Sequence, residues 1–206
     1  AVRVNNALVF PALRGYDGFG HFSYIWFMAE HWRVPMATAG WSFFHPPLYY
    51  FLMACIWKGL AGVDPLTRLH LGTALFAVLG LSHAVVSYVI VRRYFPGNRL
   101  VHLLAPGLML FLPVHLYSAG FLGNEALNAV LCSISILLLL WVLPGETRAG
   151  ERLSVTPLAD LWRTVVPRAA LLGLCLGLGM LTKFTAVVAV VGVYGTLGLR
   201  TLIKRE

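Results

Sequence analysis

The chain has 206 residues, of which 59% are hydrophobic and only 12% are charged, and its mean hydropathy is +0.77. A soluble domain carries about 25% charged residues, so this composition excludes that class and indicates an integral membrane protein. The net charge of +8 would suit a nucleic-acid partner in a soluble protein. Here, however, ten of the sixteen basic residues lie in the stretches 92–99 and 146–168 and in the C-terminal tail. Cytoplasmic loops collect such residues, so the charge indicates membrane topology and no nucleic-acid partner.

The front of the chain, 1–68, combines polar motifs with short apolar segments. Asp17 lies four residues before His21 in Gly-Tyr-Asp-Gly-Phe-Gly-His, and the turn Phe-Phe-His-Pro-Pro-Leu-Tyr-Tyr contains His45 and Tyr49. Apolar residues recur every three or four positions over 19–33, which predicts a helix that is either interfacial or part of an ordinary core. The apolar face of that helix comprises Phe22, Ile25, Trp26, Met28, Ala29 and Trp32.

The segment 48–63 has only 16 residues, follows two prolines and contains Lys58. Crossing about 30 Å of hydrocarbon takes about 20 residues in a helix. We therefore predict a re-entrant or interfacial helix, with Tyr49 and Trp57 at the level of the lipid headgroups.

Apolar runs of sufficient length predict membrane spans over 69–91, 100–120 and 126–143. The polar stretch 146–168 then predicts a loop or surface helix, and 169–199 is apolar except near Lys183. Because the arginine-rich loops belong inside, 1–68 and Glu125 should lie outside. Two short spans hinged at Lys183 also place the basic tail inside, so we predict a hinge there. The fold class expected is an all-α polytopic transmembrane bundle with an extracytoplasmic loop.

The chain begins at Ala1 without a methionine or a signal peptide. We interpret 1–206 as the N-terminal portion of one multi-span domain, with one upstream span and a C-terminal part missing. Within it, 1–68 is the extracytoplasmic loop and 69–199 contains the spans.

Five motifs in order suggest a family. They are Asp17 with His21, the Phe-Phe-His-Pro-Pro-Leu-Tyr-Tyr turn, Arg-Arg-Tyr-Phe-Pro-Gly, Gly-Asn-Glu-Ala-Leu-Asn, and Gly-Leu-Gly-Met-Leu-Thr-Lys-Phe-Thr. The set resembles the membrane glycosyltransferases that use polyprenyl-phosphate sugars, namely the protein O-mannosyltransferases and the bacterial aminoarabinose transferases of lipid A. The resemblance covers the chain from about 17 to 199, and it implies a fold of the GT-C type.

The resemblance also implies roles for individual residues. Asp17 matches the catalytic acid of the first extracytoplasmic loop, but Gly18 stands where the family usually has a second acid, which puts a paired-carboxylate or metal role in doubt. His45 takes the place of a basic residue that contacts the lipid phosphate. Glu125 matches a second acid, and Lys183 matches the lysine of Leu-Thr-Lys.

The chemistry asks for the same residue types. Moving a sugar from a polyprenyl phosphate to a hydroxyl needs a base near the acceptor and cations beside the departing phosphate. We therefore assign Asp17 and Glu125 as candidate catalytic residues. The candidate substrate-binding residues are His21, His45, Tyr49, Asn124 and Lys183. We assign no metal ligands and name no certain cofactor, although the chemistry leaves a divalent metal open.

Simpler structural roles remain open for four of these residues. Asp17 and Glu125 are each placed to cap a helix N-terminus, where a carboxylate is favoured. His45 would fill the turn before Pro46, and Lys183 would extend to the membrane interface without a ligand.

The sequence thus predicts a glycosyltransferase that moves a sugar from a polyprenyl-phosphate donor to a hydroxyl or phosphate of a lipid or protein acceptor. We expect it in the bacterial inner membrane, among membrane lipids, with its site facing outward. The alternative is a multi-span transporter or lipid-handling scaffold, which would be expected to contain an inverted repeat with broken helices in both halves. The sequence shows one candidate break, at Lys183.

Overall fold

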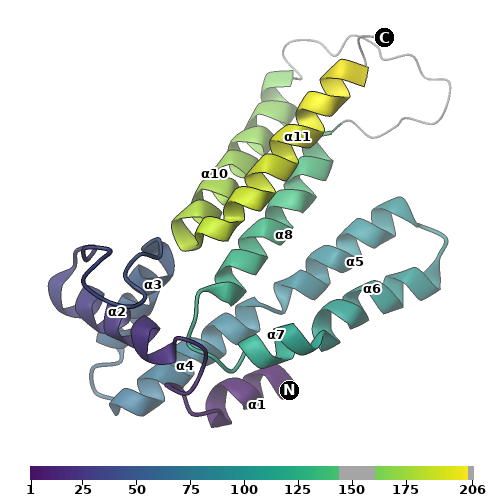
Figure 1. The fold of residues 1–206 in the computed structure, drawn as a ribbon. Helices are drawn as coiled ribbons and strands as arrows, with labels where there is room; N and C mark the ends of the chain where they lie inside the picture. The colour runs from purple at the N-terminus through teal and green to yellow at the C-terminus, as the bar shows by residue number, and fades with distance from the viewer. Residues whose placement is uncertain (144–160, 204–206) are drawn as a thin grey trace.

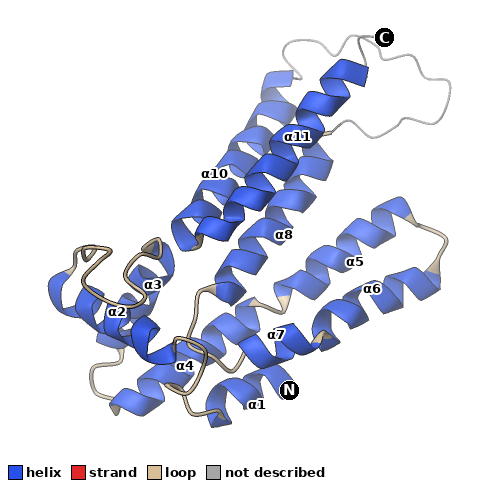
Figure 2. Ribbon diagram, in the orientation of Figure 1, coloured by secondary structure: helices blue, strands red, loops and turns tan. Residues whose placement is uncertain are grey.

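The computed structural model describes residues 1–143 and 161–203. These residues form helices and loops without a strand (Figure 2), which confirms the all-α class. The helices are α1 (Val2–Val9), α2 (Gly18–His31), α3 (Leu48–Gly59), α4 (Pro65–Leu79), α5 (Ser82–Tyr94), α6 (Arg99–Phe111), α7 (Pro113–Ser118), α8 (Glu125–Val142), α10 (Val166–Thr182) and α11 (Val187–Ile203). A π-helical turn, η1 (Leu161–Val165), precedes α10, and a 3₁₀ turn, η2 (Phe184–Ala186), precedes α11.

Within the described ranges, three helical segments are long and apolar enough to cross a membrane: Pro65–Tyr94, Glu125–Val142 and Arg163–Thr182. The predicted span 126–143 agrees with α8 to within one residue at each end. Most of the predicted polar segment 146–168 lies outside the described residues, apart from its end in η1 and the start of α10.

The predicted continuous span over 100–120 is wrong. The chain leaves the helix at Leu112, whose ψ of 124° is not helical, and this separates α6 from the short α7. Pro113 has no N–H, so the carbonyl of Met109 lacks its usual helical partner. Arg3 fills that place, because its Nη2 donates to Met109 O at 3.3 Å.

The predicted span 69–91 lies within the apolar helical segment Pro65–Tyr94, which contains one turn. The turn lies at Gly80 and Leu81, between α4 and α5. Arg3 Nη1 donates to the Gly80 carbonyl at 3.1 Å. The Gly80 carbonyl also accepts from the His83 N–H at 3.3 Å. Met109 O, which Pro113 leaves without a helical donor, is the carbonyl that depends on Arg3 in a bilayer without water.

Another proline frees a carbonyl at the end of α1. Pro11 cannot donate to Ala7 O, and His70 Nδ1 donates to that oxygen at 2.9 Å. Asn6 likewise donates to Leu116 O at 3.1 Å. Polar side chains therefore attach α1 to α4 and α7, and α1 lies beside both helices in Figure 1.

The helices α4 and α6 begin where their sequences favour a start. Asp64 accepts a hydrogen bond from the Thr67 N–H at 3.0 Å, and Pro65 follows at the first helical position. Asn98 caps α6 in the same way, by accepting from the Val101 N–H at 3.1 Å.

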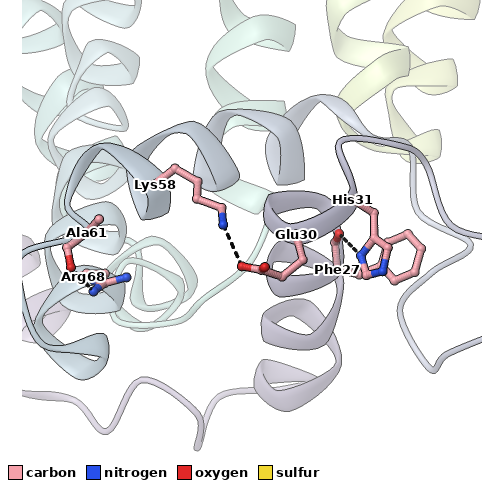
Figure 3. Close-up of polar contacts among 6 residues, drawn as sticks. All are labelled: Phe27, Glu30, His31, Lys58, Ala61 and Arg68. Carbon is pink, nitrogen blue, oxygen red and sulfur yellow. Dashed lines mark hydrogen bonds and ion pairs between the residues drawn. The ribbon is translucent and has the colours of Figure 1, made fainter.

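The helices α2 and α3 pack against each other and carry much of the first hydrophobic core. Their outer ends are joined by an ion pair of 2.7 Å between Lys58 and Glu30, and the Lys58 ammonium lowers the Glu30 pKa. Figure 3 shows this pair, with Arg68 donating to Ala61 O on the neighbouring loop. At 12 residues, α3 is not one of the three long apolar helices.

The predicted apolar face of α2 is partly buried and partly exposed. Ile25, Met28 and Ala29 are buried, but Trp26 and Trp32 are about half exposed. The face that packs against α3 includes Tyr24, whose ring stacks on Tyr50 with centroids 3.8 Å apart. Aromatic packing with α3 therefore decides which side of α2 is buried.

The predicted hinge at Lys183 is confirmed as a break in the helix. Lys183 is extended, with φ −156° and ψ 133°, and it separates α10 from η2 and α11. Figure 1 shows α10 running beside α8 toward α2 and α3, and α11 returning beside it. A second hydrophobic core joins α8, α10 and α11. The turn thus brings Lys183 to the end of the bundle that faces the first 60 residues.

Candidate functional site

The predicted site residues come from four separate segments. Asp17 and His21 lie at the start of α2, His45 lies in the turn before α3, Glu125 begins α8, and Lys183 forms the break after α10. The charges of the other four all act on the pKa of His21, so each of them lies within electrostatic range of that ring. The structure therefore gathers these residues at one place, while their roles stay predictions.

The centre of this cluster is an ion pair. Lys183 Nζ donates to Glu125 Oε1 at 2.7 Å, across 58 positions of sequence. The side chains are 23% and 46% exposed, respectively. Lys183 thus has a carboxylate partner at the protein surface. The alternative in which Lys183 extends alone to the membrane interface did not include such a partner.

Asn124 holds the two ends of this pair together. Its Nδ2 donates at 3.0 Å to the carbonyl of Thr182, which the break at Lys183 leaves without a helical donor. The Asn124 side chain is fully buried. This bond fixes the break after α10 against the start of α8, and the substrate-binding role of Asn124 stays a prediction.

A stack of aromatic rings forms the second part of the site. His21 Nδ1 bonds to the Tyr50 hydroxyl at 2.7 Å, and the ring of His21 lies nearly parallel to that of His45, with centroids 5.5 Å apart. Tyr50 is fully buried, and its own ring stacks on Tyr24. The stack fixes His21 in position, and His45 forms its partly exposed end.

Burial sets the charge of the two histidines. It lowers the pKa of His21 to about 4, although the nearby Glu125 carboxylate opposes the shift. Burial also lowers the pKa of His45, and the Lys183 ammonium acts in the same direction. Both imidazoles are therefore neutral near pH 7, so Lys183 is the cation of the cluster and His45 would meet a phosphate as a neutral hydrogen-bonding group.

Asp17 occupies the N-cap position of α2, yet its side chain makes no capping bond. Its Oδ1 instead accepts a hydrogen bond of 2.7 Å from the indole N–H of Trp41. The backbone of Asp17 is left-handed, with φ 57°, a conformation that aspartate and asparagine tolerate better than most residues. This geometry leaves Asp17 Oδ2 without a capping role.

The two adjacent tyrosines of the turn lie differently, and the substrate-binding role of Tyr49 stays a prediction. Tyr49 is buried against Gly123, whose backbone bonds to it, and burial raises its pKa. Tyr50 is the residue that bonds to His21. Reasoning from the sequence missed Trp41; its signal was its place four residues before His45, in the same turn.

Gly123 lies between the two halves of the site. A Cβ built on Gly123 would collide with Glu125 Oε2 and would lie 3.8 Å from His21 Nε2. The Glu125 carboxylate therefore passes close over Gly123, toward the ring of His21.

Among the described residues, no group of three His, Cys, Asp or Glu side chains is arranged to hold a metal ion. A cavity of about 140 Å³ adjoins the site, and it includes Glu125 but none of the other predicted site residues.

Comparison with known proteins gives no family to which the chain belongs: no family model, no curated protein and no solved structure matches it. The resemblance drawn from the five motifs therefore stays a prediction.

Proposed function

We propose that the protein is a membrane glycosyltransferase that moves a sugar from a polyprenyl-phosphate donor to a hydroxyl or phosphate of a lipid or protein acceptor. The reaction would take place on the outward face of the bacterial inner membrane. The observation that carries the proposal is the meeting of Asp17, His45, Glu125 and Lys183, which the motif order assigned to one site and which come from distant segments.

The geometry suits a division of roles. Lys183 supplies the positive charge that a departing phosphate requires, and His45 supplies a neutral hydrogen bond beside it. Asp17 has one carboxylate oxygen bonded to Trp41 and would use the other to take the proton from an acceptor hydroxyl. Glu125 would leave Lys183 when the phosphate binds, because both anions compete for one ammonium.

One observation favours the transporter alternative. The sequence alone indicated a single broken helix, but the structure has a further break at Leu112. Broken helices are typical of secondary transporters. Only an assay of sugar transfer therefore distinguishes a glycosyltransferase from a transporter.

The deciding experiment measures sugar release by the full-length protein in nanodiscs. The donors are undecaprenyl phosphates that carry radiolabelled mannose or aminoarabinose, with an envelope lipid extract as acceptor. Asp17→Asn should lower turnover about 10²- to 10⁴-fold onto a hydroxyl acceptor, because it removes the base while keeping the left-handed backbone favourable. Lipid phosphate should be released only as sugar is transferred.

Asp64→Asn is the matched control. Asparagine caps a helix as well as aspartate does, so this variant should fold and transfer sugar normally. Turnover by Asp17→Asn at the level of this control would remove Asp17 from the mechanism. Movement of labelled donor across the bilayer without transfer would favour the transporter.

A further inference from the structure

A cavity with a mostly apolar wall and a few polar side chains lies between α1, α7, α8 and the turn that separates α4 from α5. Its volume is about 140 Å³, well above the roughly 30 Å³ that one water occupies in the liquid. Its polar lining comes from four elements: Arg3, His83, His115, Ser118 and Glu125. Except for Glu125, these residues take no part in the site described above.

Arg3 is the charged group of this cavity, and it is only 6% exposed. Its two terminal nitrogens donate to the carbonyls of Gly80 and Met109, while its Nε is buried without a partner. A guanidinium stays charged in proteins. Two carbonyl oxygens satisfy hydrogen bonds but do not neutralise that charge.

Every carboxylate in the described part of the chain is engaged elsewhere. Asp17 bonds to Trp41, Glu30 to Lys58, Asp64 to the Thr67 N–H, and Glu125 to Lys183. Glu125 lines the cavity, but Lys183 already balances its charge. Within the described residues, no carboxylate is thus left to balance Arg3, and the environment is apolar, where an unbalanced charge is costly.

His83 adds a second unpartnered polar atom. It is 6% exposed, its Nδ1 bonds to Ser133 Oγ at 2.6 Å, and its Nε2 is buried with no hydrogen-bond partner. Its ring lies 5.2 Å from that of His115, centroid to centroid. Ser133 lies on a neighbouring cavity, while His115 and Ser118 line the cavity of Arg3.

We propose that this cavity binds a phosphate group, either as free phosphate or as the phosphate monoester of a lipid headgroup. A guanidinium forms strong, charge-assisted bonds to phosphate oxygens, and an imidazole and a hydroxyl on the same wall add donors from other directions. A tetrahedral anion accepts bonds from several directions, whereas a planar carboxylate accepts them in one plane. The proposal does not depend on transferase activity.

The test is equilibrium dialysis of [³²P]phosphate against the full-length protein in dodecyl maltoside, a detergent that contains no phosphate. The wild-type protein should bind saturably, with about one phosphate per chain. Arg3→Met should weaken binding at least tenfold, whereas Arg14→Met, at an exposed arginine near the same helix, should not. Displacement by lysophosphatidic acid would assign the site to a lipid headgroup, and lack of displacement would assign it to free phosphate.

Arg3→Met also removes bonds to the carbonyls of Gly80 and Met109, so a second variant leaves Arg3 in place. Ala129→Leu fills the cavity wall with a larger apolar side chain and should abolish binding. Ala169→Leu, on the exposed side of α10, is its control and should bind as the wild type does. No saturable binding by the wild-type protein would mean that the cavity holds only water, and normal binding by Ala129→Leu would place the phosphate elsewhere; either result overturns the proposal.

Discussion

The ion pair between Lys183 and Glu125 predicts that its two residues affect lipid-phosphate binding in opposite directions. If phosphate and Glu125 compete for Lys183, then Glu125→Gln frees the ammonium. The pair is partly exposed, at 23% and 46%, and such pairs are screened to about 0.2–1 kcal/mol. Since 1.4 kcal/mol is tenfold, Glu125→Gln should tighten binding by roughly 1.5- to 5-fold.

Lys183→Ala should act the other way. It removes a charge-assisted hydrogen bond to the phosphate, which contributes about 1.5–3 kcal/mol, so binding should weaken by roughly 10- to 100-fold. The assay is equilibrium binding of tritiated undecaprenyl phosphate to the protein in nanodiscs at pH 7.5.

A matched ion pair serves as the control. Lys58 and Glu30 also lie 2.7 Å apart and are both 42% exposed, but they join the ends of α2 and α3 away from the site. Lys58→Ala and Glu30→Gln should leave the Kd unchanged. A larger Kd for both Glu125→Gln and Lys183→Ala would refute competition between Glu125 and the phosphate. An unchanged Kd for Lys183→Ala would remove the lysine from the phosphate site.

Two further predictions concern the residues beside this pair. Because the pKa of His21 falls from 6.5 to about 4 on folding, the unfolded chain binds more protons between these values. Thermal stability should therefore decline as pH falls from 6.5 to 4, by up to roughly 3 kcal/mol, and His21→Gln should flatten that slope in a thermal-shift series. Gly123→Ala should displace the Glu125 carboxylate and lower kcat for sugar transfer about tenfold, with an unchanged Tm. Wild-type kcat in that variant would show that the position of Glu125 is unimportant.

The elements predicted best are those with a strong local signal. The run of α8 is apolar from end to end, and Lys183 is the one charged residue in a long apolar stretch, so both the helix and the break could be recognised from the sequence. The motifs also named residues whose charges act on His21, although their roles stay predictions. These features depend on the type of residue at a given position.

The elements predicted worst depend on contacts between distant segments. Pro113 was visible, but its effect on 100–120 depends on Arg3, which donates to the freed carbonyl across 106 positions of sequence. The choice between Tyr49 and Tyr50 depends on which ring meets His21 across two packed helices. Apolar periodicity contains neither piece of information.

Glu125 belongs to both polar regions of the protein, and this affects how its variants are interpreted. Its Oε1 bonds to Lys183, while its side chain also lines the cavity of Arg3. Replacing it with glutamine would therefore raise the positive charge around both regions together. Lys183→Ala and Arg3→Met each remove a cation from one region only. Suppose that the donor phosphate binds at Lys183 and a second phosphate binds at Arg3. Of these three variants, only Glu125→Gln should then strengthen phosphate binding at both places, because it alone removes a negative charge that lies near both phosphates.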